Sequence, residues 1–229
     1  IISTRIEHAS VYNPLAFLEQ QGFEVTYLSV DGQGHISLEE LEASIRPDTI
    51  MVSVMYVNNE VGAIEPVEEI ASLVHGKNPA ILLHVDAIQA YGKLVIHPKK
   101  QGIDLLSVSA HKFHGPKGVG FLFIDERVKI RPLLYGGGQQ KDLRSGTENV
   151  PGIAGMGAAA WEMYTDHQKK VDYIISLKDY MIDRMEQLEG VTVNSLKGSQ
   201  GAPQIVSAGF AGVRSEVLLH ALEDKGIYV

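Results

Sequence analysis

Short apolar runs rich in β-branched residues alternate along the chain with stretches whose apolar residues recur at helical spacing. The clearest runs show no regular alternation of apolar and polar positions, which is typical of strands buried on both faces of a parallel sheet. The predicted strands are residues 1–6, 23–30, 49–57, 81–85, 105–109 and 119–124. Strands that alternate with helices in this way predict an α/β fold with a mainly parallel sheet.

Sequence signals for helix starts lie between these runs. Asn13-Pro14 is expected to begin the first helix, and Pro66 favours the start of another. Ser37 and Glu40 fit a capping box, in which the serine accepts from an early helical N–H and the glutamate reaches back to the cap. These starts place helices in the connections between the predicted strands.

After residue 150 the pattern changes to a long helical stretch. Pro151 predicts a helix that continues, with a bend, to about Leu188, and its apolar positions are typical of core packing. Shorter elements follow, namely strands at 191–193 and 204–210 and a helix capped by Ser215. This part is expected to begin a smaller α+β domain.

The two patterns predict two domains, a large domain over residues 1–165 and part of a smaller C-terminal domain over residues 166–229. The chain starts at Ile1 rather than Met, and it stops at Val229 in what resembles the start of a strand. Both ends are therefore expected to be cut, with the N-terminal part of the large domain missing.

Composition excludes several classes of function. The 229 residues carry a net charge of −8 without a dense basic run, which argues against nucleic acid as a partner. No stretch of about 18 uncharged apolar residues occurs, so no membrane span is expected. The absence of cysteine excludes disulfides and thiolate metal sites for this chain. The expected location is cytoplasmic.

The stretch from Ser107 to Gly118 is the most informative for chemistry. It places Lys112 between His111 and His114, in a loop between two apolar runs. Burial and cationic neighbours lower a lysine's pKa and make its amine a better nucleophile toward a carbonyl. The pattern therefore predicts a buried, reactive amine, and a surface lysine in a polar loop is the alternative.

Other polar residues also follow predicted strands. Asn58-Asn59-Glu60, Asp86 and His111-Lys112 each come after the C-terminal end of an apolar run. In parallel sheets, ligands bind at the carboxyl ends of the strands, so these residues are expected to share one crevice.

Asp86 has two interpretations. It could cap the next helix, or it could hold the ring nitrogen of pyridoxal phosphate protonated, a cofactor that also needs a Schiff-base lysine. Lys112 and Asp86 would supply both groups. His8 could stack on the ring, although a lone histidine near a strand end is often structural.

Several motifs together resemble a known family. They are His84-Val85-Asp86-Ala87-x-Gln89, Ser109-Ala110-His111-Lys112-x-x-Gly115-Pro116-Lys117-Gly118, Gly136-Gly137-Gly138 and Arg144-Ser145-Gly146-Thr147-Glu148-Asn149, with Glu7-His8 and Val57-Asn58-Asn59-Glu60-Val61-Gly62 in the same order. Over its whole length the chain resembles the cysteine desulfurases of the NifS/IscS branch. That branch belongs to the class V aminotransferase superfamily and has pyridoxal-phosphate fold type I.

The resemblance implies a role for each matching residue at the cofactor ring. Lys112 would form the Schiff base, Asp86 would pair with the pyridine nitrogen, and His8 would stack on the ring. Asn59 and Gln89 would contact the phenolic oxygen.

The resemblance also implies a phosphate site. Ser109 and His111 would bind the cofactor phosphate, and Thr147 would reach in from a second subunit of a homodimer. His111 could instead be a loop histidine with a local hydrogen bond. Its pairing with His114 does not predict a metal site, because no third ligand lies nearby.

The implied activity is the removal of sulfur from L-cysteine, which leaves alanine and an enzyme persulfide for iron–sulfur cluster or thiolation pathways through a sulfur-acceptor protein. The chain departs from the family in having no cysteine. In the family the cysteine loop follows shortly after a segment resembling residues 226–229, so it is expected beyond Val229. The arginine that binds the substrate carboxylate is expected still further on.

Two alternatives stay open from the sequence. The first is another class V enzyme that uses the same lysine site, such as a selenocysteine lyase or an aminotransferase. The second is a non-catalytic fragment that acts as an interaction partner.

Overall fold

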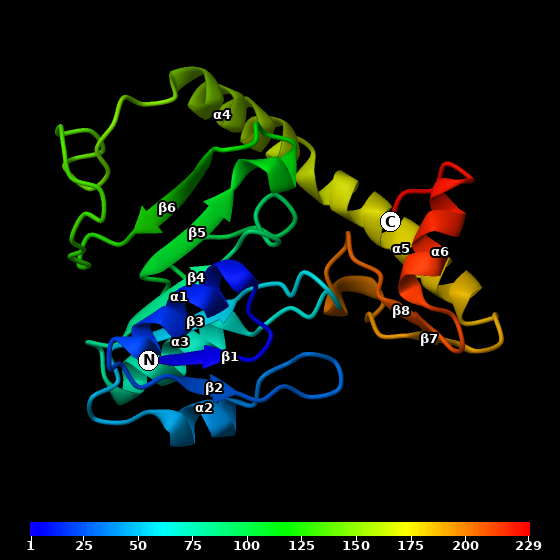
Figure 1. Cartoon of the computed structure of the whole chain (residues 1–229), viewed down its shortest axis with the longest axis horizontal. Helices are drawn as coiled ribbons and strands as arrows, with labels where there is room; N and C mark the ends of the chain where they lie inside the picture. The colour runs from blue at the N-terminus through cyan, green and yellow to red at the C-terminus, as the bar shows by residue number, and fades with distance from the viewer.

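A six-stranded sheet forms the centre of the computed structural model, which describes all 229 residues (Figure 1). Its strands are β1 (Ile2–Thr4), β2 (Thr26–Leu28), β3 (Met51–Met55), β4 (Leu82–Asp86), β5 (Leu105–Ser109) and β6 (Gly120–Ile124). They lie in the order β2-β1-β3-β4-β5-β6, and all neighbours pair in parallel except β5 and β6. The predicted α/β fold with a mainly parallel sheet is confirmed.

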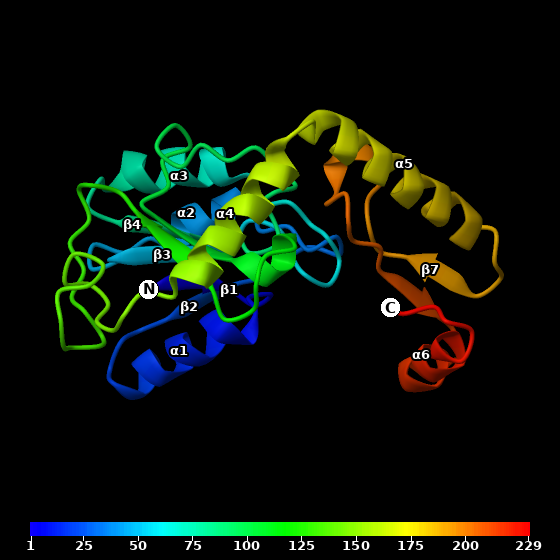
Figure 2. The same cartoon turned by 90° about the horizontal axis from the view of Figure 1, so that it is seen from above.

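Helices cover both faces of this sheet. Helix α1 (Ala9–Gln20) lies on one face, and α2 (Leu38–Ser44) and α3 (Val67–Lys77) lie on the other (Figure 2). Ile70 and Val74 of α3 belong to the same buried apolar cluster as Val54 and Val85 of the sheet. Burial of this cluster is the main force that holds the layers together.

The first helix starts earlier than the sequence predicts. It begins at Ala9, and His8 caps it because its Nδ1 accepts the N–H of Ser10 at 3.1 Å. Pro14 lies inside the helix, so the expected start at Asn13-Pro14 is wrong. The histidine provides the cap that a Ser, Thr, Asp or Asn usually provides.

Half of the predicted capping box is present at α2. Ser37 Oγ accepts the N–H of Glu40 at 3.1 Å, as predicted. The reciprocal bond is replaced, because the Glu40 carboxylate accepts the N–H of Ser29 at 3.1 Å instead. Glu40 therefore ties α2 to the segment that follows β2.

The predicted long, bent helix is two helices. They are α4 (Val150–Tyr164) and α5 (His167–Met185), and Asp166 between them has a left-handed backbone with φ 49°. A non-glycine residue in that conformation ends the first helix rather than bending it. The break falls beside residue 165, and the division into two domains there stays a prediction.

A small antiparallel sheet follows the helices. Strand β7 (Val191–Val193) pairs with β8 (Ala208–Phe210), and α6 (Ser215–Glu223) comes last. The strand expected over 204–210 is shorter because β7 offers it only three residues to pair with. The cap of α6 is Arg214 rather than Ser215.

No helix in the structure combines the length and the apolar character needed to cross a membrane.

Candidate functional site

The carboxyl ends of four neighbouring parallel strands meet at one edge of the sheet, on the side nearer to β7 and β8 (Figure 1). His8 follows β1, Asn59 follows β3 and Asp86 ends β4. Ser109 ends β5, and Lys112 lies in the 3₁₀ turn η1 (Ala110–Phe113) directly after it. The structure thus brings these five predicted site residues to the same edge, in sheet order.

Asp86 is buried, with 2% of its surface exposed. Its Oδ1 accepts the N–H of Ile88 at 2.9 Å, so it does brace the turn that follows β4. Its Oδ2 accepts no hydrogen bond from the protein. Burial raises the pKa of the Asp86 carboxyl, and the bond from Ile88 and the charge of nearby His8 oppose that rise. Asp86 therefore offers one free carboxylate oxygen.

Lys112 is exposed, so the expectation of a buried amine is wrong. The turn η1 buries Ala110 and Phe113 instead, and the Phe113 ring packs against Tyr91 with centroids 4.9 Å apart. The Lys112 amine makes no hydrogen bond or ion pair within the chain. The buried residues Ala110 and Phe113 thus fix the backbone on either side of Lys112, while the Lys112 amine stays free to react.

Ser109 and His111 form a polar pair beside Lys112. The Ser109 hydroxyl lies 2.9 Å from His111 Nδ1. His114 is exposed and has a left-handed backbone with φ 67°. No group of three or more His, Asp or Glu side chains is placed to hold a metal ion. The hydroxyl and imidazole can both donate to an anion.

Asn59 and Gln89 are half-buried, and their side chains make no hydrogen bond within the chain. The neighbouring Asn58 organises this turn, because its Oδ1 accepts the N–H groups of Glu60 and Val61, both at 2.9 Å. Asn58 holds the backbone and leaves the Asn59 amide available to a ligand.

Thr147 is not brought to this edge within the chain. It is exposed and lies in the loop 125–149 between β6 and α4, which extends away from the carboxyl ends of the strands (Figure 1). Arg144 in the same loop donates to the main-chain oxygen of Ser145 and forms no ion pair. The role of Thr147 at the phosphate of a second subunit stays a prediction.

Sequence reasoning missed Glu7, a buried residue of this edge. Its Oε1 accepts from Thr4 Oγ1 at 2.8 Å and from the Met55 N–H at 2.9 Å, while its Oε2 is buried without a partner. Burial raises the pKa of Glu7 to about 7, and Asp86 contributes to that rise. A carboxylate directly before His8 in a strand-end motif was the available signal.

His84 was also missed. Its ring lies between two serines on one sheet face, with Nδ1 2.8 Å from Ser53 Oγ and Nε2 2.8 Å from Ser107 Oγ. Burial lowers the pKa of His84 to about 4, so the ring is neutral at pH 7. A polar residue at the centre of each of three apolar strands was a usable signal, since a period of two can place such residues on one face of the sheet.

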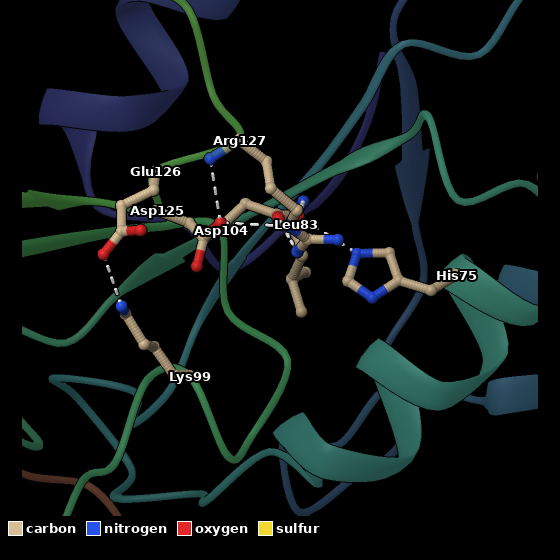
Figure 3. Close-up of polar contacts among 7 residues, drawn as sticks. All are labelled: His75, Leu83, Lys99, Asp104, Asp125, Glu126 and Arg127. Atoms are coloured by element: carbon tan, nitrogen blue, oxygen red, sulfur yellow. Dashed lines mark hydrogen bonds and ion pairs between the residues drawn. The ribbon is translucent and has the colours of Figure 1, made fainter.

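A second polar cluster lies at the opposite, amino edge of the sheet (Figure 3). Asp104, directly before β5, accepts from the Leu83 N–H at 2.8 Å, from His75 at 3.0 Å and from Arg127 at 2.8 Å. All of its bonds are internal, and it braces β4 against β5. The cluster is structural and far along the strands from Lys112.

The residues at the carboxyl edge fit pyridoxal phosphate. Lys112 offers a free amine for the aldehyde, and Asp86 offers a free carboxylate oxygen for the ring nitrogen. Ser109 and His111 offer donors for the phosphate. The fold is that of the pyridoxal-phosphate proteins of fold type I, and the donor set suits this cofactor.

The chain belongs to the aminotransferase class-V family, whose model matches residues 1–229. Pyridoxal phosphate, the cofactor expected from the sequence, is the cofactor of this family. The expected likeness to the NifS/IscS branch is also confirmed by the similar proteins.

Two curated relatives are the cysteine desulfurases IscS of Dictyoglomus turgidum and of Methanosarcina thermophila. They are 41% and 44% identical to this chain over its whole length. The chain spans 58% and 56% of their lengths.

Solved structures agree with the sequence relatives. A NifS-like protein has a TM-score of 0.96 at 41% identity, with 100% of this chain and 62% of that one covered. DndA from Streptomyces lividans has a TM-score of 0.85 at 38% identity, with 97% of this chain and 63% of that one covered.

Proposed function

We propose that the protein is a pyridoxal-phosphate-dependent cysteine desulfurase, which takes sulfur from L-cysteine and leaves alanine. One observation carries this proposal: the unpaired amine of Lys112 and the free oxygen of Asp86 stand at the carboxyl ends of neighbouring strands. The printed name of the relatives, cysteine desulfurase, supports the choice of reaction.

The two central residues have complementary tasks. The Lys112 amine would hold the cofactor covalently, and the same amine, once freed by the substrate amine, would move the proton at the substrate's α-carbon. The Asp86 carboxylate would accept a hydrogen bond from the ring N–H and would keep that proton in place. When bound, the cofactor supplies an electron sink for the charge that develops at the α-carbon.

The surrounding residues orient the cofactor. His8, held as the cap of α1, would stack on the ring, and the amides of Asn59 and Gln89 would contact the phenolic oxygen. Ser109 and His111 would donate to the phosphate. Ser109 ends β5, and His111 lies in η1, the turn that also carries Lys112. The side chains of Asn59 and Gln89 make no hydrogen bond within the chain, which suits a contact with the phenolic oxygen.

Sulfur transfer needs a nucleophilic thiolate, which Ser, Thr and Lys cannot replace. These 229 residues contain no cysteine. We therefore assign the thiol that forms the persulfide to a part of the protein outside them. Purified residues 1–229 are expected to release no sulfide from cysteine above a control with free cofactor. Release above that control would contradict the thiolate mechanism.

The protein is proposed to act as a homodimer, in which Thr147 donates to the phosphate held by the other subunit. Large apolar side chains are exposed along the loop 125–149 and α4, among them Leu133, Tyr135 and Trp161 at 90%, 81% and 79%. Apolar surface of this kind marks interaction sites. Sedimentation of the full-length protein should show a dimer.

The wider setting follows from the same proposal. The persulfide sulfur passes to an acceptor protein for iron–sulfur cluster or thiolation pathways, in the cytoplasm. Residues 1–165 form the cofactor-binding domain, and residues 166–229 form part of the smaller domain.

The test is chemical trapping of the cofactor. Borohydride reduction of the full-length protein with pyridoxal phosphate, followed by peptide mapping, should place the adduct on Lys112. An adduct on Lys117 or Lys93 would overturn the assignment.

A further inference from the structure

Lys93 is a buried cation next to the proposed site that no step above uses. Only 8% of its surface is exposed, and no carboxylate pairs with it. Its ammonium donates instead to the main-chain oxygen of Lys112. Burial, together with a smaller contribution from the charge of Lys112, lowers the pKa of Lys93 to about 8. A buried ammonium without a counter-ion is costly, so this contact is unusual for a residue that only fills space.

The local backbone brings Lys93 to Lys112. Gly92 has φ 80°, a conformation that favours glycine, and a Cβ there would lie 3.3 Å from Phe113 Cβ. The Gly92 N–H also donates to the Tyr164 hydroxyl at 3.1 Å. The absence of a side chain at Gly92 thus lets this segment approach η1 closely, and the next residue reaches the Lys112 carbonyl.

Lys93 also belongs to the segment that carries Asp86. Asp86 ends β4, and the chain from Ala87 to Lys93 is a tight turn, with main-chain bonds from Ala90 N to Ala87 O at 3.0 Å and from Lys93 N to Ala90 O at 3.0 Å. The bond from Lys93 to Lys112 therefore joins the segment of Asp86 to the turn of Lys112.

We propose that Lys93 is a positioning residue, which fixes the Lys112 turn relative to Asp86 so that the amine and the carboxylate fit one cofactor. The inference rests on the proposed function, because it needs pyridoxal phosphate to be held by Lys112 and Asp86. The exposed Lys112 side chain has no partner of its own, so its direction depends on how its backbone is held. Lys93 holds that backbone at the carbonyl.

Lys178 offers a matched control. It is 3% exposed, and its ammonium donates to the main-chain oxygens of Gly198, Gly201 and Ala202 at 2.8, 3.0 and 3.3 Å. Burial lowers its pKa as well. It makes the same kind of contact as Lys93, between α5 and the turn at 198–202, without touching Lys112. Replacing either lysine with Met removes a buried ammonium and keeps the apolar stem.

The experiment compares Lys93→Met, Lys93→Arg and Lys178→Met in the full-length protein loaded with pyridoxal phosphate. Lys93→Met should release the cofactor about tenfold faster or more, and its visible absorption spectrum should shift, because a charged hydrogen bond to the Lys112 turn is lost. Lys93→Arg, which keeps the charge and a donor, should restore most of the parent behaviour. Lys178→Met should lower the thermal midpoint and leave the spectrum and release rate unchanged.

The outcomes separate the two proposals. If the parent gives no borohydride adduct on Lys112, the proposed function fails. If the parent gives that adduct and Lys93→Met keeps the parent's spectrum and release rate, the positioning role of Lys93 is overturned. Should Lys93→Met not fold, Lys93→Gln removes the charge and is one bond too short to reach the Lys112 carbonyl in the same way, so it should show the same changes; parent-like values there would overturn the role equally.

Discussion

The Glu7 carboxylate accepts the main-chain N–H of Met55 at 2.9 Å, and this bond joins the end of β1 to the end of β3. Met55 is the register partner of Asp86 in the next strand. Glu7 follows β1, and β3 alone separates β1 from β4, the strand that ends at the proposed ring-nitrogen partner Asp86. Its second oxygen is buried without a partner, which is costly for an ionised carboxylate.

Glu7 should make stability fall as pH rises. Its pKa is about 7 in the folded chain and 4.5 when unperturbed, so between these values the folded state binds more protons than the unfolded state. In Glu7→Gln the amide keeps an acceptor for Met55 and cannot ionise. Relative to the parent, the variant should gain stability from pH 4.5 to 7, by about 3 kcal/mol at most. Urea unfolding across this range measures the gain.

The exposed Glu60 provides the control for that series. Glu60→Gln alters the same kind of group on the surface and should follow the parent at every pH. A Glu7→Gln difference that stays flat across pH would mean that the carboxyl ionises normally in the folded protein.

His84 should act in the opposite direction on the acid side. Its pKa is about 4 in the folded chain against 6.5 when unperturbed, so the unfolded state takes up a proton first as pH falls. His84 therefore makes stability drop between pH 6.5 and 4. His84→Gln, which keeps a donor and an acceptor for the serines, should lose this part of the acid sensitivity in urea unfolding. The exposed His97→Gln is the control, and equal acid slopes in the two variants would rule out the effect.

The serine contacts of His84 give a separate prediction. His84→Leu leaves the hydroxyls of Ser53 and Ser107 without their partner. The free energy of unfolding should fall by roughly 1–3 kcal/mol, since a buried polar group without a bond costs about that much. Thermal unfolding of His84→Leu beside His84→Gln at neutral pH tests this, and equal midpoints would contradict it.

The strand that ends at Asp86 and the strand that leads to Lys112 were predictable because their apolar runs are short, continuous and followed by polar residues. Observed β5 begins and ends where the sequence places it, and β4 is shifted by one residue. The gathering of their ends at one edge follows from parallel pairing alone. That much of the site is encoded locally.

Other features depend on contacts that no local pattern contains. The start of α1 depends on a histidine cap, and the end of α4 depends on the left-handed backbone at Asp166. The ring of His84 meets Ser53 only because strand register places them side by side. Lys93 is buried, and Lys112 exposed, because of how the turn after β4 packs on η1.

The Asp104 cluster in Figure 3 should support stability without affecting the cofactor site. Asp104→Ala leaves the Leu83 N–H and His75 without their buried partner, so it should cost about 3–5 kcal/mol. Arg127 is 64% exposed, and Arg127→Ala should cost at most about 1 kcal/mol. Urea unfolding measures both.

Cofactor affinity is the second measurement on these variants. Asp104 precedes β5 at the amino edge, whereas Lys112 follows β5 at the carboxyl edge. Folded Asp104→Ala should bind pyridoxal phosphate as tightly as the parent. A matching loss of affinity would mean that the two edges are coupled.

Asp86→Asn distinguishes the two roles that the structure allows for this carboxylate. The amide oxygen can still accept the Ile88 N–H, so the turn after β4 should keep its form and the thermal midpoint should change little. The negative charge is lost, and with it the charge-assisted bond to the ring nitrogen.

We expect Asp86→Asn to retain bound cofactor while turnover of L-cysteine by the full-length protein falls by about 10- to 100-fold. The loss is expected in turnover because the ring charge matters most when negative charge develops at the α-carbon, in the transition state. Asp86→Ala removes the brace as well and should also lower the thermal midpoint. Steady-state kinetics with both variants, beside their cofactor spectra, decides the matter. Parent-like turnover in Asp86→Asn, with a lowered midpoint only in Asp86→Ala, would leave Asp86 as a brace for the turn and nothing more.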